Sequence, residues 1–132
     1  MNHFSGWDAV IEELKAEKLR QFHVRGFLII EENALAVAST LYNPDLEEQL
    51  CRLGGRIWEI LDQARKDLEL SESPYLWLAG VERHVAIIPL GRKFLLMAVC
   101  DATASPATTL IPLLAFGQRL LTRLLTLSEK VS

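Results

Sequence analysis

Apolar residues change their spacing several times along the chain, and each change marks the boundary of a predicted element. Near the N-terminus they recur every three or four positions among charged residues, which predicts an amphipathic helix from Ser5 to about Arg20. Ser5 and Asp8 have the spacing of a helix-capping box. Residues 24–30 are apolar on both alternating faces, and residues 34–41 follow a polar interruption, so these segments are predicted to form a buried strand and its hairpin partner.

A second helix is predicted from Asn43 to about Leu68, because Asn43 or Asp45 can cap it and Pro44 suits a first helical turn. A narrow apolar edge, Cys51, Gly54 and Trp58, lies beside its main stripe. Gly54 and Gly55 each cost about 1 kcal/mol relative to alanine inside a helix. They indicate a close approach to the helix backbone or a kink. The main stripe consists of Leu46, Leu50, Leu53, Ile57, Ile60, Leu61, Ala64 and Leu68.

Three further strands and a last helix are predicted in the second half of the chain. The apolar segments 75–81, 85–90 and 93–100 form a meander whose last two strands are joined by a tight turn at Gly91. The last helix is predicted to begin near Thr109, with Pro112 in its first turn. Its buried stripe consists of Leu113, Leu114, Gly117, Leu120, Leu121, Leu124 and Leu125.

The order of these elements, α-β-β-α-β-β-β-α, indicates a mixed α/β (α+β) fold. Strands that are apolar on both faces need cover on both sides. We therefore predict a three-layer α/β/α sandwich around a central five-stranded antiparallel sheet. The sequence has no internal repeat and no long linker, so residues 1–132 are expected to form a single domain.

Composition narrows the classes of function. Half of the 132 residues are hydrophobic and 23% are charged, a balance that supports a sizeable core without disulfides or a structural metal. The formal charge of -3, from 14 basic and 17 acidic residues, argues against nucleic acid as a partner. Cys51 and Cys100 lie in apolar segments, as reduced thiols do. Without a signal peptide or a membrane-spanning segment, the protein is expected to be cytoplasmic and not inserted in a membrane.

No group of residues has the spacing of a catalytic or cofactor site. His3, His23 and His84 lie in three different segments, without the neighbouring ligands of a metal site. The glycines form no phosphate-binding loop, and the serines form no nucleophile elbow. Cys51 lacks the electropositive setting of a reactive thiolate. Asp101 is the best-placed acid, and a loop cap explains it better. We therefore expect no enzyme activity, no metal and no cofactor.

The third predicted strand is the most informative surface feature. Tyr75, Trp77 and Ala79 share one of its faces, and the strand lacks the charges and prolines that blunt an exposed edge. If it is a sheet edge, it should pair with another chain; otherwise its aromatic residues pack under a helix. The narrow edge of the second helix offers small residues and a large anchor to a two-fold interface. The predicted dimer interface therefore combines Cys51, Gly54, Trp58, Tyr75, Trp77 and Ala79.

From about Trp7 to Leu125 the sequence resembles the roadblock family of dynein light chains and their prokaryotic relatives. Family members usually carry Asp and Gly in the first hairpin turn, where this chain has Glu31-Glu32-Asn33-Ala34, and Asn33 is expected to take the glycine's backbone role. The segments that carry the resemblance are Arg25-Gly26-Phe27-Leu28-Ile29-Ile30 with Ala36-Val37-Ala38-Ser39, and Ile87-Ile88-Pro89-Leu90-Gly91 with Phe94-Leu95-Leu96-Met97-Ala98-Val99.

This resemblance implies a profilin-like sandwich, with the second helix on one face of the sheet and the terminal helices on the other. It also implies a homodimer, or a heterodimer with a similar protein, in which third strands pair and second helices pack side by side. Family members are non-enzymatic regulators or adaptors of motor complexes or of small Ras-like GTPases. The expected GTPase contact is the exposed side of the second helix, at Glu48, Arg52, Arg56 and Glu59; a merely solvated charged face is the alternative interpretation.

A function of another class stays open. Profilin-like sandwiches are similar to ligand-sensing folds, so the chain could be a small-molecule sensor or enzyme, PAS-like, with a pocket between the sheet and a helix. A polar cluster inside an apolar cavity would favour this function, and the sequence shows none.

Overall fold

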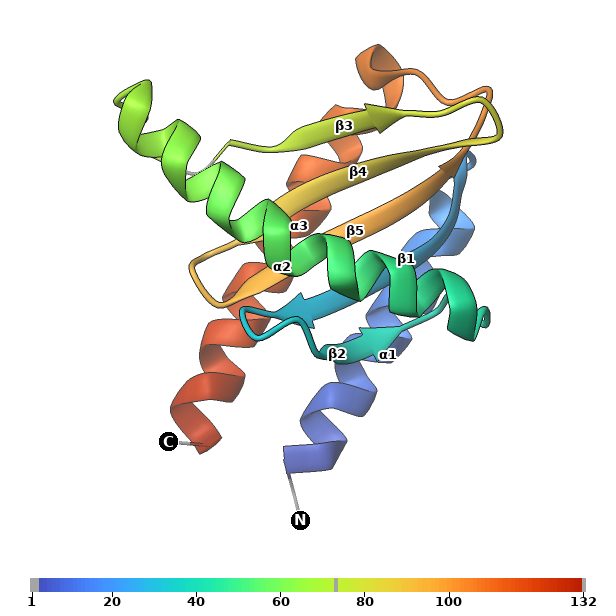
Figure 1. Cartoon of the computed structure of the whole chain (residues 1–132). Coiled ribbons are helices and arrows are strands. Elements are labelled where there is room, and N and C mark those ends of the chain that lie inside the picture. The colour runs from blue at the N-terminus through green and yellow to red at the C-terminus, as the bar shows by residue number, and fades with distance from the viewer. Residues whose placement is uncertain (1–2, 73, 132) are drawn as a thin grey trace.

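The predicted order of helices and strands is confirmed by the structure, a computed structural model that describes residues 3–72 and 74–131. Over these residues the chain forms three helices and five strands, shown in Figure 1. They are α1 (His3–Arg20), β1 (Val24–Glu31), β2 (Ala36–Ser39), α2 (Pro44–Asp67), β3 (Leu76–Ala79), β4 (Arg83–Leu90), β5 (Phe94–Asp101) and α3 (Pro106–Val131).

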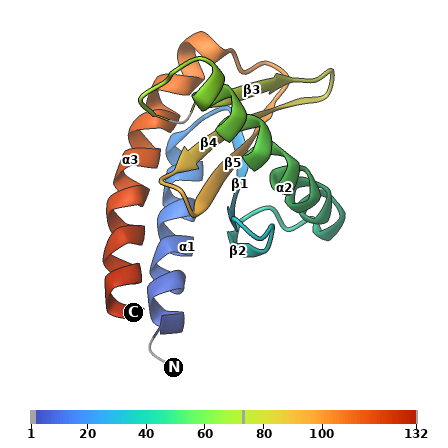
Figure 2. The same cartoon turned by 60° about the vertical axis from the view of Figure 1, so that its left-hand side comes forward.

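The strands form one antiparallel sheet in the order β2-β1-β5-β4-β3. β5 therefore lies at the centre, while β2 and β3 are the two edges. The helices α1 and α3 lie side by side on one face of the sheet, and α2 crosses the other face diagonally (Figures 1 and 2). The predicted three-layer sandwich is confirmed.

Two apolar cores, one on each face of the sheet, account for the strands that are apolar on both sides. In β1, Phe27 and Ile29 pack with the helices α1 and α3, whereas Leu28 and Ile30 pack with α2. All four side chains are fully buried. This alternation is the period of two expected of a strand, with both faces covered.

α2 packs very closely on the sheet at Gly54, as the pair of glycines indicates. A Cβ atom on Gly54 would lie 2.0 Å from Cδ1 of Ile30, so a larger residue there would have to displace this buried side chain. Gly55 faces away from the sheet, and a Cβ atom there would meet only Ala34, at 3.5 Å. α2 is one continuous helix over both residues, so close approach, rather than a helix break, explains Gly54.

The ends of the helices differ from the prediction in two places. α1 begins at His3, two residues before Ser5. α3 begins at Pro106 rather than near Thr109, so Pro112 lies inside the helix instead of in its first turn. Pro112 is exposed, and the helix accepts the loss of one backbone hydrogen bond there. Asn43 caps α2 as predicted, because its side chain accepts a hydrogen bond from the Leu46 N–H at 3.1 Å.

The first hairpin turn uses a different residue from the one predicted. Ala34, with φ of 67°, takes the left-handed backbone that we expected of Asn33. The Asn33 side chain instead accepts a hydrogen bond from the Leu35 N–H at 3.3 Å, which stabilises the turn.

Over the described residues, every helix is too short or too polar to cross a membrane.

Candidate functional site

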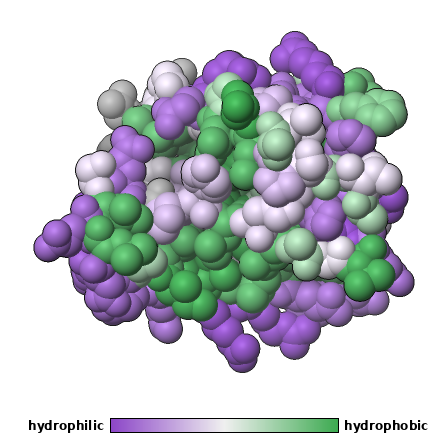
Figure 3. All heavy atoms as spheres, turned by 90° about the horizontal axis from the view of Figure 1, so that it is seen from above, coloured by the Kyte–Doolittle hydropathy of each residue, from purple (hydrophilic) through white to green (hydrophobic). Residues whose placement is uncertain are grey.

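β3 is an edge strand, and apolar side chains lie exposed along it. Tyr75 is 47% exposed and Leu78 is 39% exposed, and the strand contains no charged residue and no proline. On the face of the molecule seen from above in Figure 1, hydrophobic residues gather between charged ones (Figure 3). Such an edge presents unpaired backbone groups and apolar side chains to another chain.

The sequence left open whether the aromatic residues of β3 pair with another chain or pack under a helix, and Trp77 is partly consistent with both. It is half-buried against the core under α1 and α3, and its ring contacts that of His84 at a centroid distance of 5.4 Å and an interplanar angle of 37°. His84 Nδ1 accepts a hydrogen bond from the Gly80 N–H, and Nε2 lies 3.2 Å from the Ala102 carbonyl oxygen. A neutral imidazole with its proton on Nε2 satisfies both contacts. Trp77 therefore belongs partly to the protomer's own core.

The predicted residues on α2 do not form one surface with β3. Gly54 is buried against Ile30. Cys51 and Trp58 lie on the flank of α2 that faces the β1–β2 hairpin, where they border hollows shared with Glu32 and Leu35. That hairpin is at the opposite edge of the sheet from β3.

The other flank of α2 carries an apolar residue for which the sequence predicted burial. Ile60 is 56% exposed, and at 100° per residue it lies about 200° around the helix from Trp58. In Figure 1, β2 lies on one side of the diagonal path of α2 and β3 on the other. The exposed Ile60 side chain is therefore on the flank of α2 opposite the hollow that Trp58 borders.

The four charged residues expected to contact a partner all lie on the solvent side of α2. Glu48, Arg52, Arg56 and Glu59 are exposed. Among the residues that the structure describes, none of the four forms an ion pair; the ion pairs of α2 are Asp62 with Arg65 and Asp62 with Lys66. Their charges are therefore available to a partner, with two of each sign.

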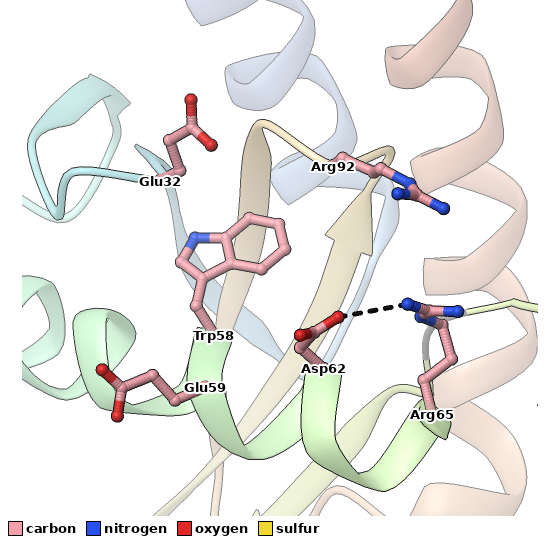
Figure 4. A pocket seen from close by; sticks show the side chains of 6 residues that line it. All are labelled: Glu32, Trp58, Glu59, Asp62, Arg65 and Arg92. Carbon is pink, nitrogen blue, oxygen red and sulfur yellow. Dashed lines mark hydrogen bonds and ion pairs between the residues drawn. The ribbon is translucent and has the colours of Figure 1, made fainter. Parts of the chain in front are cut away.

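A hollow of about 400 Å³ lies beside Trp58, between α2 and the turns at Glu32 and Arg92 (Figure 4). The Trp58 Nε1 atom is buried and has no hydrogen-bond partner among the described residues. On the opposite wall, a hydrogen bond from Lys66 and then one from Arg65 lower the pKa of Asp62. This hollow, with its unpartnered N–H group, is not evident from the sequence, because it depends on how the two turns meet the helix.

Asp101 acts as the loop cap that the sequence favoured. Its Oδ1 accepts hydrogen bonds from the Thr103 hydroxyl at 2.6 Å and from the Thr103 N–H at 3.0 Å, and these bonds chiefly hold its pKa below the usual value. His23 Nδ1 approaches both Asp101 Oδ1, at 3.4 Å, and the Thr103 hydroxyl, at 3.3 Å. Both groups meet the same ring nitrogen, so the histidine is not placed to relay a proton between them.

The two cysteines are weakly acidic thiols. Burial is the main cause that raises the pKa of Cys51, followed by the charge of Glu47. Burial, with a smaller effect of Asp101, raises the pKa of Cys100 to about 11. Neither has the lowered pKa of a nucleophilic cysteine. Over the part of the chain that the structure describes, no group of three or more His, Cys, Asp or Glu residues is placed to hold a metal ion.

No protein-family model matches the sequence, and no curated protein matches it significantly. Solved structures match its fold. MglB from Myxococcus xanthus has a TM-score of 0.76 at 14% identity, over 96% of this chain and 93% of that one. A second MglB structure, described as having a tetrameric arrangement, has a TM-score of 0.75 at 19% identity, over 89% of each chain.

Two other kinds of protein have a similar fold. A roadblock/LC7 domain from Streptomyces avermitilis has a TM-score of 0.75 at 10% identity, over 87% of this chain and 97% of that one. Profilin IA from Acanthamoeba castellanii has a TM-score of 0.55 at 13% identity, over 86% and 97%. The profilin-like sandwich that the sequence resemblance implies is thereby confirmed.

Proposed function

We propose that this chain, which has the roadblock fold, acts as a dimeric regulator or adaptor of a small Ras-like GTPase or of a motility complex, through protein contacts and without a catalytic residue of its own. The whole chain would act as one domain, in the cytoplasm. The exposed edge strand β3 carries the proposal: it offers Tyr75 and Leu78 to a second chain and has no blunting residue. The tetrameric arrangement of an MglB structure of the same fold supports self-association.

The proposed dimer is two-fold symmetric, with β3 beside the β3 of the partner. A two-fold axis brings the same residues of both chains together. Leu78 of each chain would then lie near the axis, and Ile60 would extend the contact onto α2. Of the six residues predicted for the interface, the proposed dimer would use Tyr75, Trp77 and Ala79. It would not use Gly54, which is buried, or Cys51 and Trp58, which border hollows beside the β1–β2 hairpin.

The dimer is tested with Leu78→Lys, which puts two like charges beside the axis. We expect light scattering to give a dimer for the wild-type chain at micromolar concentration and a monomer for Leu78→Lys. Ile111→Lys, on an exposed residue of α3, is the matched control and should stay dimeric. Leu78 is preferred to Trp77, because replacing Trp77 would also remove its contact with His84. A monomeric wild-type chain, or a dimeric Leu78→Lys variant, would contradict the proposed interface.

The partner is tested by capture of purified Ras-like GTPases, each loaded with GDP or with a non-hydrolysable GTP analogue. The exposed charges of α2 that lack ion pairs support its solvent side as the contact. We expect capture in one nucleotide state only, and a loss of capture for Arg52→Glu/Arg56→Glu. The control Lys15→Glu/Lys93→Glu changes the net charge equally on other elements and should bind normally. If no Ras-like GTPase is captured in either state, the regulator function is wrong even where the dimer is right.

The hollow beside Trp58 supports ligand sensing as a second candidate function. A buried N–H group without a partner costs about 1–3 kcal/mol, so a ligand that offers an acceptor oxygen would recover part of this free energy. Binding of such a ligand should change the emission of Trp58 in a Trp7→Phe/Trp77→Phe variant. A library of small polar compounds that leaves both the emission and the thermal stability unchanged would count against this candidate.

A further inference from the structure

The edge of the sheet opposite β3 borders a groove that the proposed dimer does not use. It lies between the β1–β2 hairpin with β2 and the first turns of α2, and its volume is about 570 Å³. Leu35 forms one wall and Tyr42 the other, and Cys51 contributes from α2. Leu35 is 61% exposed and Tyr42 is 77% exposed, so the groove presents apolar surface to solvent.

Tyr42 is held in an unusual conformation for a large residue. Its φ of 54° lies in the left-handed region, which disfavours non-glycine residues. Its side chain is largely exposed to solvent, and the Lys18 ammonium lies over the ring, 5.7 Å from its centroid. A strained backbone that displays an exposed aromatic ring is typical of a binding position.

The charge of the groove is negative. Glu47 and Glu48 line it, and Asp45 lies two residues before Glu47 on α2. The ammonium of Lys18, over the Tyr42 ring, is a basic neighbour of this groove, and the acidic residues outnumber it. The effect of Glu47 is already visible within the chain, since its charge contributes to the raised pKa of Cys51. A cationic group placed in the groove would be attracted, and an anionic one repelled.

β2 adds a backbone contribution. It is the outermost strand and pairs on one side only, with β1, so its other side can accept a further extended chain. An extended segment presents alternate side chains to opposite sides. One set would face Leu35 and Tyr42, and the other set would reach Glu47 and Glu48.

We propose that the β2 groove binds an extended, cationic and apolar segment of a partner protein. Lysine or arginine side chains would contact Glu47 and Glu48, and the apolar side chains between them would cover Leu35 and Tyr42. A nucleic acid does not fit, because its phosphates would meet the two glutamates. The site lies at the opposite edge of the sheet from β3, so it does not depend on the proposed dimer, although it shares Glu48 with the proposed GTPase contact on α2.

The proposal is tested by fluorescence anisotropy with the full chain and a fluorescein-labelled ten-residue peptide of alternating lysine and valine. We expect saturable binding of this peptide and none of a glutamate–valine peptide of the same length. The variant Glu47→Lys/Glu48→Lys should weaken binding by at least about tenfold, because repulsion replaces two attractions. The control Glu59→Lys/Asp67→Lys makes the same change of net charge on the same helix, away from the groove, and should bind within about twofold of the wild-type chain, as a general charge effect falls off with distance.

A second measurement uses the wild-type chain alone and so does not depend on the folding of any variant. Peptide-induced changes of amide chemical shift should concentrate in residues 34–51. Equal weakening by both double variants would reduce the binding to general charge attraction and overturn the proposal. Shift changes centred on other residues would also overturn the proposal. So would shift changes in residues 34–51 when the protein is diluted without peptide, because these would show that a second copy of this chain occupies the groove.

Discussion

The adjacent glycines of α2 should respond oppositely to the same substitution. A Cβ atom on Gly54 would lie 2.0 Å from Cδ1 of Ile30 and 3.3 Å from Cε of Met97, and both of these side chains are fully buried. A Cβ atom on Gly55 would lie 3.5 Å from that of Ala34, which is ordinary van der Waals contact. We therefore expect Gly54→Ala to destabilise the chain and Gly55→Ala to stabilise it.

The magnitudes follow from two opposing effects. Replacing glycine by alanine inside a helix stabilises it by about 0.8–1 kcal/mol. Gly55→Ala has this gain alone. Gly54→Ala has the same gain, but it also forces a methyl group into a filled core, which costs about 1–3 kcal/mol. The free energy of unfolding of Gly54→Ala should therefore lie about 1–3 kcal/mol below that of Gly55→Ala.

Urea unfolding of the two variants at one protein concentration measures this difference. Thermal unfolding gives a second measure: with an unfolding entropy of about 2.1 cal/mol/K per residue, a difference of 1 kcal/mol corresponds to roughly 3–4 °C in Tm for a chain of this length. The dependence on urea should be the same for both variants, because both unfold the same surface. Equal stabilisation by Gly54→Ala and Gly55→Ala would refute the close packing of α2 on β1 that the structure shows.

Three further predictions concern the protomer. Thr109→Val should raise the free energy of unfolding by about 1 kcal/mol in a urea titration, because the buried Thr109 hydroxyl has no partner among the described residues; a loss of stability would show that it has one. Cys51 should react with a thiol reagent at pH 8 before Cys100, whose pKa is about 11 and which should react only in denaturant; two equal rates would contradict the burial of Cys100. Asp101→Asn should be less stable than the wild-type chain at pH 7. Because the pKa of Asp101 is lowered on folding, its carboxylate stabilises the fold above the usual value of 3.8, and the difference should shrink as the pH falls below it; a constant difference in Tm would exclude this carboxylate effect.

The sheet could be predicted from the sequence because its strands are apolar on both faces. Residues 26–30 and 95–100 are uninterrupted buried runs, and a helix of the same length would have placed polar residues at intervals. The hairpin turn between β1 and β2 was less predictable. Asparagine adopts left-handed backbone more readily than alanine, yet Ala34 adopts it here. The Asn33 side chain instead accepts a hydrogen bond from the Leu35 N–H, and this contact outweighs the usual preference of asparagine.

The direction in which α2 crosses the sheet could not be predicted from the sequence. Helical spacing identifies which residues share a stripe, but it cannot say which edge of the sheet each flank faces. The sequence therefore joined Trp58 to Tyr75, although Trp58 faces the hairpin. It also placed Leu68 in the buried stripe. The end of α2 extends past the sheet in Figure 1, and Leu68 is 68% exposed there.

The diagonal path of α2 gives the chain two surfaces of different chemistry at opposite edges of one sheet. The side of β3 is apolar, with Leu78 and the Ile60 flank, and suits a permanent contact between like chains. The side of β2 combines apolar walls with two glutamates and suits a contact of opposite charge. Because Leu78 and Glu47 lie at opposite edges of the sheet, substitutions at these two residues should act additively on stability and separately on binding. A dimer joined through β3 would then carry one β2 groove at each far end of its continuous sheet.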